Sequence, residues 1–282
     1  STVAHCPADY EQLASGSYDK TVRIWKIWSN YCEKVLIGHT HQVTCLAYHP
    51  GGKRLVSGSW DRTIRFWEVT TEECKAVLEG HTDWIESIAY HPDGLQLASG
   101  GCDKTIRIWD LTSINSQMRL KGHTAGIESV GYCPAGGQLV SASGDKTLRL
   151  WEIGELKCQT PLEGHIDKVA SVAYRSDSSQ LASGSWDERI RLWDVKTKQC
   201  QRVLKGHSGW VLTVAYHPNG LQLASGGRDK KIRLWDTENG ENQAILEGHT
   251  ECVTSVAYRF DGSQLASGSW DNTIRLWDLD AR

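Results

Sequence analysis

The sequence contains no run of about 18 apolar residues, the length that a membrane-spanning helix requires. Its first residues, Ser1 to His5, also lack the basic and apolar regions of a secretory signal. The net charge is only −3 at pH 7, so the chain has no overall attraction for nucleic acids or anionic lipids. We therefore expect neither a nucleic-acid partner nor a membrane partner.

Cysteine pairs with the close spacing of metal ligands are also missing. Because no Cys-x2-Cys motif or similar pair occurs, the sequence predicts no metal site and no cofactor. The nine cysteines are odd in number, and four take the same position in the repeats described below. Neighbouring repeats lie about 10 Å or more apart, beyond the reach of a disulfide. We expect reduced thiols and an intracellular location, cytoplasmic or nuclear. The four cysteines are Cys32, Cys74, Cys158 and Cys200.

Tryptophan is the most abundant aromatic residue, with 13 copies, whereas phenylalanine occurs only twice. Methionine, another large apolar residue, occurs once. Seven tryptophans recur every 42 residues, and six Gly-His pairs recur at the same interval. An interval of this size indicates a repeat architecture. Because no linker interrupts it, we expect residues 1–282 to form one domain, although the length alone suggests about two. The recurring residues are Trp25, Trp67, Trp109, Trp151, Trp193, Trp235 and Trp277, with His39, His81, His123, His165, His207 and His249.

Each repeat shows the two-residue apolar alternation of β-strands rather than helical spacing. Short runs rich in β-branched and aromatic residues are separated by glycine, aspartate and proline, which predicts four short strands per repeat and an all-β fold. In one repeat we expect strands at Ile85–Tyr90, Leu95–Gly100 and Thr105–Trp109, a fourth around Ser116–Leu120, and turns at 91–94 and 102–104.

A serine in the second strand and an aspartate before the third strand also return in every repeat. Together with the Gly-His opening and the Trp-Asp close, they resemble the WD-repeat (WD40) family over essentially the whole chain. The resemblance implies an all-β, seven-bladed β-propeller of four-stranded antiparallel blades around a narrow central channel. Closing such blades in a ring also protects their sheet edges. The aspartates are Asp19, Asp61, Asp103, Asp145, Asp187, Asp229 and Asp271, and the serines are Ser15, Ser57, Ser99, Ser141, Ser183, Ser225 and Ser267.

The resemblance further implies a hydrogen-bonded set of His, Ser, Asp and Trp inside each blade. A buried carboxylate and an indole N–H both need partners, and a shared network supplies them. Histidine, serine and aspartate are also the residue types of a catalytic triad, but a triad occurs once, at a pocket, and is not copied in every repeat. We therefore predict no catalytic residues. The structural sets are His81, Ser99, Asp103 and Trp109, and His165, Ser183, Asp187 and Trp193.

The two ends of the sequence do not complete the pattern. The first strand is expected at Thr2 to Cys6 without a preceding Gly-His pair, and the sequence ends soon after the last third strand. Propellers of this family usually close by combining strands from both ends, so we predict that the last blade lacks its outer strand. Its edge, Thr273 to Leu279, would be open to strand donation. We favour an excerpt of a longer protein over a partner that supplies the strand.

Five of the remaining six tryptophans fall at only two repeat positions. One position directly precedes the turn aspartate, and the other lies three residues after the Gly-His histidine. In the family both positions face the end of the channel that commonly binds peptides. Because tryptophan and tyrosine dominate binding hot spots, we predict a partner-binding face there, against the alternative that the rings only roof the channel. The predicted residues are Tyr18, Trp60, Trp84, Trp186, Trp210, Trp270, Glu86, Lys168 and Arg228, and Glu128 and Leu212 fill matching positions.

The resemblance implies a non-enzymatic scaffold that docks a protein or peptide on this face. One alternative is a regulatory or sensory module of a larger enzyme. Another is a reader of modified lysine, which would need two or three aromatic rings within about 6 Å of one cation. An enzyme acting at the channel mouth has no residue set that departs from the repeat in a catalytic pattern.

Overall fold

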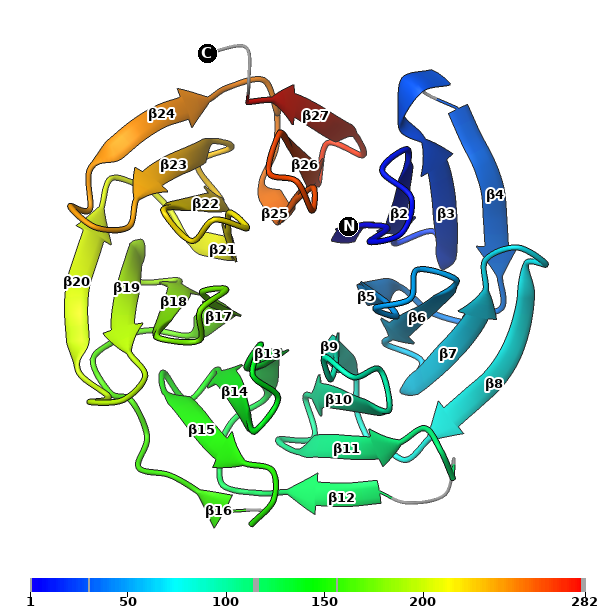
Figure 1. Ribbon diagram of the computed structural model, residues 1–282, viewed down its shortest axis with the longest axis horizontal. Coiled ribbons are helices and arrows are strands. Elements are labelled where there is room, and N and C mark those ends of the chain that lie inside the picture. Colours follow the sequence, from blue (N-terminus) through cyan, green and yellow to red (C-terminus); the bar gives the residue numbers. More distant parts are fainter. Residues whose placement is uncertain (1, 30, 114–116, 156, 280–282) are drawn as a thin grey trace.

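The computed structural model describes residues 2–29, 31–113, 117–155 and 157–279. Seven antiparallel sheets form a ring, with the first strand of each sheet nearest the centre (Figure 1). Six sheets have four strands and the last has three, which confirms the predicted all-β, seven-bladed propeller with an incomplete final blade. One helical turn, η1 (Ile27–Ser29), follows the third strand of blade 1. In blades 1 to 7, the strands are β1 (Thr2–His5), β2 (Gln12–Gly16), β3 (Thr21–Lys26), β4 (Tyr31–Ile37); β5 (Val43–Tyr48), β6 (Arg54–Ser59), β7 (Thr63–Glu68), β8 (Glu73–Glu79); β9 (Ile85–Tyr90), β10 (Gln96–Gly101), β11 (Ile106–Asp110), β12 (Gln117–Leu120); β13 (Ile127–Tyr132), β14 (Gln138–Ser143), β15 (Leu148–Glu152), β16 (Lys157–Cys158); β17 (Val169–Tyr174), β18 (Gln180–Ser185), β19 (Arg189–Asp194), β20 (Cys200–Lys205); β21 (Val211–Tyr216), β22 (Gln222–Gly227), β23 (Ile232–Asp236), β24 (Asn242–Leu246); β25 (Val253–Tyr258), β26 (Gln264–Ser269) and β27 (Ile274–Asp278).

In blade 3, strands β9, β10 and β11 lie within one residue of their predicted bounds. β9 has the predicted bounds, but β10 and β11 each begin one residue later than predicted. Strand pairing sets these starts: β10 begins with Gln96 opposite Asp110, and the ladder of β11 with β12 begins with Ile106 opposite Leu120. Leu95 and Thr105 precede these strands, and their N–H groups donate to Asp93 Oδ1 at 2.7 Å and to Asp103 Oδ1 at 3.0 Å. The predicted start of the fourth strand, Ser116, lies outside the described residues.

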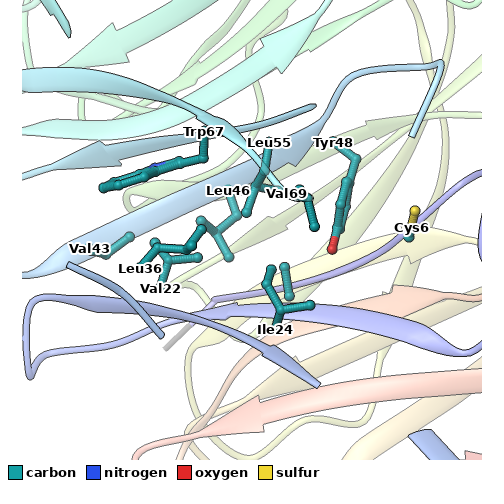
Figure 2. Close-up of a cluster of buried hydrophobic side chains, with 11 residues drawn as sticks. Cys6, Val22, Ile24, Leu36, Val43, Leu46, Tyr48, Leu55, Trp67 and Val69 are labelled. Carbon is teal, nitrogen blue, oxygen red and sulfur yellow. The ribbon is translucent and has the colours of Figure 1, made fainter. Parts of the chain in front are cut away.

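The hydrophobic core lies between blades rather than within them. Figure 2 shows the joint of blades 1 and 2, where Val22, Ile24 and Leu36 of blade 1 share a cluster with Leu55 and Trp67 of blade 2. Burying one such leucine contributes about 1.5–3 kcal/mol. Because every blade gains this burial only against its neighbours, the stability of each blade depends on the ring.

Blade 7 meets blade 1 through the inner strands. β1 packs against β25 and β26, and Val3 shares a buried cluster with Ala266. The N–H of Val3 donates to Ser255 Oγ at 3.2 Å, which repeats the bond from the N–H of Val214 to Ser171 Oγ at the joint of blades 5 and 6 (3.1 Å). The inner part of the ring is therefore closed with the same kind of contact that joins neighbouring blades elsewhere.

The outer part of this joint is open. Within the described ranges, β27 pairs only with β26, which agrees with the predicted free edge at Thr273 to Leu279. A groove of about 1020 Å³, here called the edge groove, lies between β27 and blade 1. In blades 1 to 6, an outer strand covers the corresponding edge of the third strand. Residues that line the edge groove include Leu13, Ser15, Asp19 and Trp25 of blade 1 and Ile274 and Leu276 of blade 7.

Candidate functional site

Five tryptophans outside the structural sets occupy two repeat positions, the one before the turn aspartate and the one three residues after the Gly-His histidine. Backbone hydrogen bonds join these two positions within a blade. The N–H of Trp60 donates to the carbonyl of Gln42 at 3.0 Å, and the N–H of Trp186 donates to that of Lys168 at 2.9 Å. These bonds hold the turn before the third strand against the loop before the first strand. The side chains of both loops are thereby presented from one end of the propeller.

Four tryptophans form two stacked pairs, and each pair bridges neighbouring blades. Trp60 of blade 2 lies on Trp84 of blade 3, with 4.0 Å between ring centroids and 10° between planes. Trp186 of blade 5 lies on Trp210 of blade 6 at 3.9 Å and 5°. Tyr18 meets Trp60 edge-on, 6.4 Å between centroids. The rings thus support one another within the protein, in arrangements that aromatic pairs favour.

Cations of the chain itself cover the second pair. Lys168 Nζ lies 4.7 Å from the ring centroid of Trp186, and the guanidinium carbon of Arg228 lies 4.4 Å from that of Trp210. The four side chains form one stack of cation, ring, ring and cation. An aromatic cage needs open ring faces around a single foreign cation, so this arrangement gives no support to the modified-lysine alternative.

A cavity of about 250 Å³, here called the channel-mouth cavity, opens among these side chains. First-strand residues of six blades contribute to its lining, which places it at the centre of the ring. Of the nine predicted partner-binding residues, Trp84, Trp210 and Arg228 do not line the cavity but stack as described above. The other six do line it: Tyr18, Trp60, Trp186, Trp270, Glu86 and Lys168.

Two carboxylates dominate the electrostatics of the cavity. Glu86 Oε1 accepts from Trp60 Nε1 at 3.0 Å and from Cys102 Sγ at 3.6 Å. Burial, followed by the neighbouring charge of Glu128, raises the pKa of Glu86 to about 7. Glu128 pairs with Lys168 at 2.8 Å, and burial raises its pKa against the opposing effect of that lysine. Glu86 is thus a carboxylate whose hydrogen-bond partners are neutral groups.

The predicted structural sets do form continuous hydrogen-bond chains. In blade 3, Trp109 Nε1 donates to Ser99 Oγ at 2.8 Å, and His81 lies 2.7 Å from Ser99 Oγ and 2.9 Å from Asp103 Oδ2. The tautomer with the proton on Nδ1 satisfies every group, because Ser99 then donates to Nε2 and Nδ1 donates to Asp103. Ser99 has no exposed surface, so its hydroxyl cannot meet a substrate.

Blade 5 repeats this geometry with His165, Ser183, Asp187 and Trp193, all at 2.7–2.8 Å. Burial opposes ionisation of Asp187, but hydrogen bonds led by the one from His165 hold its pKa below the usual value. The carboxylate is therefore charged at neutral pH and fully committed to the fold.

Seven segments match the family described as "WD domain, G-beta repeat": residues 1–26, 30–68, 72–110, 114–152, 156–194, 198–236 and 240–278. From the second segment on, each begins at the outer strand of one blade and ends at the third strand of the next blade. The chain belongs to the WD40 family.

Short segments of this WD40 chain are similar to curated proteins. A stretch of 43 residues is 51% identical to a nuclear distribution protein PAC1 of Mycosarcoma maydis and covers 15% of this chain and 10% of that protein. A stretch of 41 residues is 46% identical to a Lissencephaly-1 homolog of Branchiostoma floridae and covers 14% and 10%. Another PAC1, of Cryptococcus neoformans var. neoformans serotype D (strain JEC21 / ATCC MYA-565), is 40% identical over 52 residues, 18% and 12%. The matched stretches thus span only about a tenth of these relatives.

The cross-blade pairing of the tryptophans was not predicted, although the sequence holds a signal for it. Trp60 and Trp84 are separated by 24 residues, and so are Trp186 and Trp210. This offset joins the turn of one WD40 blade to the loop of the next. Gln42 also lines the channel-mouth cavity and was not predicted, because glutamine at one loop position carries no distinctive pattern.

No group of three or more His, Cys, Asp or Glu side chains in the described ranges is arranged to hold a metal ion. Nor does the described part of the chain contain a helix long and apolar enough to cross a membrane.

Proposed function

We propose that this WD40 propeller is a non-enzymatic scaffold that binds a peptide or protein segment across the face formed by the two tryptophan pairs and the channel-mouth cavity. The observation that carries the proposal is the pairing of rings around this cavity, Trp60 with Trp84 and Trp186 with Trp210. Rigid aromatic side chains lose little conformational entropy when a partner binds. The 250 Å³ cavity supplies a recess for one anchoring side chain.

The test is a selection of random heptapeptides against the chain. A Trp60→Ala/Trp210→Ala variant with an unchanged melting temperature should bind the selected peptides at least about tenfold more weakly, because truncating interface hot spots costs about 2 kcal/mol or more. Trp28→Ala is the matched control, since Trp28 is 73% exposed but lies at the other end of β3 from the Tyr18 turn. Equal binding by the wild type and the double variant would reject this face as the docking site.

We propose as a second candidate that the edge groove accepts an extended segment as a donated strand. In the described part of blade 1, no histidine bridges the serine and the aspartate of the structural set. Ser15 Oγ accepts a hydrogen bond from Trp25 Nε1 at 2.8 Å, and Asp19 pairs with Arg23 instead of with a histidine. The Asp19 side chain is 44% exposed, against 1–8% for the aspartates that pair with histidine in the other six blades. The exposed carboxylate of Asp19 supports a donor strand that carries a Gly-His pair, with an apolar residue three positions before the histidine.

A peptide that copies residues 244–250, Ala-Ile-Leu-Glu-Gly-His-Thr, tests this candidate. In blades 6 and 7 this segment places Leu246 in the core and His249 between Ser267 and Asp271. The peptide should raise the melting temperature of the chain, and a version with alanine for histidine should raise it less. Equal shifts from both versions would exclude recognition through the histidine. The test does not depend on which polypeptide supplies the strand.

The location proposed for this scaffold is a reducing compartment, the cytoplasm or the nucleus. All nine cysteines lie within the described residues and all are free, which supports this placement.

A further inference from the structure

The channel-mouth cavity has an excess of hydrogen-bond acceptors. Glu86, Glu128 and Gln42 all line it, and Lys168 is the one positively charged side chain among its lining residues in the described part of the chain. The Oε1 atom of Gln42 is buried and has no hydrogen-bond partner there. A buried acceptor without a donor is costly, so a ligand that brings donors into the cavity would be favoured.

Lys168 already has two interaction partners within the protein. Its Nζ lies 2.8 Å from Glu128 Oε1 and 4.7 Å from the ring centroid of Trp186. The nearest partners of Glu86 are the indole N–H of Trp60 and the thiol of Cys102, and neither carries a positive charge. The cavity therefore contains two carboxylates and one cation, and the cation is bound to Glu128.

The walls around Glu86 suit an aliphatic stem that ends in a charge. Tyr18, Trp60, Trp186 and Trp270 contribute apolar ring surface to the same cavity. Lysine and arginine both bury their methylene stems along such surfaces while the charged head reaches a polar group. The volume of about 250 Å³ is a recess for one side chain and not for a folded element.

We infer that the channel-mouth cavity receives a lysine or arginine side chain of the bound peptide, with Glu86 as the carboxylate that pairs with its charge and Gln42 as a further acceptor. This inference rests on the proposed docking of a peptide on the tryptophan face, and it adds the chemistry of the anchoring residue. The charge of the cavity carries it, since a foreign cation would neutralise the one carboxylate that lacks a charged partner.

The experiment continues the heptapeptide selection. Peptides enriched on the wild-type chain should share a lysine or arginine at one position. The best peptide is then synthesised with its basic residue and with a neutral analogue of similar length, citrulline for arginine or norleucine for lysine. We expect the neutral analogue to bind at least about tenfold more weakly to the wild type, a difference of about 1.4 kcal/mol.

Glu86→Gln is the decisive variant, because glutamine keeps an oxygen that can accept from Trp60. In this variant the basic and neutral peptides should differ by less than about threefold in dissociation constant. Glu247→Gln is the matched control, since it removes the same charge from an exposed residue that pairs with Lys231 on the outer rim. That variant should retain the full preference for the basic peptide.

The pH dependence gives a second readout. In the free chain Glu86 has a pKa of about 7, and a bound cation favours its ionised form, so binding releases protons and strengthens as the pH rises. Affinity for the basic peptide should increase by about tenfold from pH 6 to pH 8 and become nearly flat in Glu86→Gln. The other titratable groups around Glu86 are Glu128, Lys168, Cys102, Cys45 and Tyr18, and the ring centroid of His41 lies 5.7 Å from that of Trp60. A His41→Gln variant that keeps the slope separates Glu86 from this histidine.

The outcomes distinguish this inference from the proposed function. Peptides that need Trp60 and Trp210 but show no basic preference would overturn the inference and leave the docking face intact. A basic preference that survives Glu86→Gln would overturn the assignment to Glu86. Failure to select any peptide that depends on the tryptophans would reject both.

Discussion

At the scale of single residues, each buried turn aspartate accepts several hydrogen bonds, so we expect it to stabilise the fold. Asp187 Oδ2 accepts from His165 and from the N–H of Ile166, and its Oδ1 accepts from the N–H of Arg189. Asp187→Ala leaves the buried imidazole of His165 without its acceptor, and the two backbone N–H groups lose theirs as well. We expect it to lower the free energy of unfolding by about 1–3 kcal/mol, measured by urea denaturation.

Asp19→Ala is the matched control for that substitution, because Asp19 has the same repeat position but no histidine partner. Its side chain is 44% exposed and pairs with Arg23 at the surface. Exposed pairs contribute about 1 kcal/mol or less, so Asp19→Ala should cost clearly less than Asp187→Ala. Equal losses would mean that the turn, and not the histidine network, accounts for the role of these aspartates.

Residue roles that recur could be predicted from the sequence, whereas roles that depend on one local departure could not. Ser99, His81 and Asp103 return in register in other repeats, so the period itself predicts a shared structural task. The buried oxygen of Gln42 and the neutral partners of Glu86 arise from side-chain packing around a single cavity. No periodic signal encodes such contacts, because they depend on which residues happen to meet at the centre of the ring.

At the scale of elements, two strands of identical sequence experience different surroundings. β23 and β27 both read Ile-Arg-Leu-Trp-Asp, but β23 is covered by β24 and β27 has a free edge among the described residues. Ile232 is fully buried, whereas its counterpart Ile274 is partly exposed and lines the edge groove. Because the two strands have the same sequence, β-propensity cannot explain any difference in what the two isoleucines contribute to the free energy of unfolding.

Comparing these two isoleucines measures how much an outer strand contributes to the stability of the third strand that it covers. Ile232→Ala should lower the free energy of unfolding by about 2–5 kcal/mol, as expected for a fully buried isoleucine. Ile274→Ala should cost less than half as much, because its side chain already meets solvent. Urea denaturation of both variants makes the comparison, and similar losses would show that the edge groove is occupied by some other part of the protein in solution.

In blade 3, the bounds of β9, β10 and β11 were predicted to within one residue because glycine, aspartate and proline mark the turns between them. The later start of β11 follows from its partner strand: β11 begins with Ile106 opposite Leu120 of β12, whereas β7 begins one repeat position earlier, with Thr63 opposite Glu79 of β8. Where a ladder begins depends on the length of the partner strand as well as on residue type. The stacking of Trp60 on Trp84 lies beyond strand prediction altogether, since it requires the rotation between neighbouring blades.

At the scale of the whole molecule, the ring joins parts of the chain that are most distant in sequence. Val3 and Ser255 are 252 residues apart, yet their hydrogen bond repeats the contact that joins adjacent blades elsewhere. The outer part of the same joint carries the edge groove instead of a fourth strand. Closure of the propeller therefore depends on a narrow inner seam formed by β1, β25 and β26.

A charge placed in that seam should loosen both ends of the chain together. Val3 is 6% exposed and lies in a cluster with Ala266, so Val3→Asp buries an unpaired carboxylate there. Amide hydrogen exchange should then rise in β25 and β26 as much as in β1 and β2, while β13 to β15, across the ring in Figure 1, keep their protection. Trp28→Ala, an exposed change in blade 1, should leave every blade unaffected. If exchange increases only in blade 1, the two ends are merely adjacent, and each of the seven blades derives its stability from sequence neighbours rather than from closure of the ring.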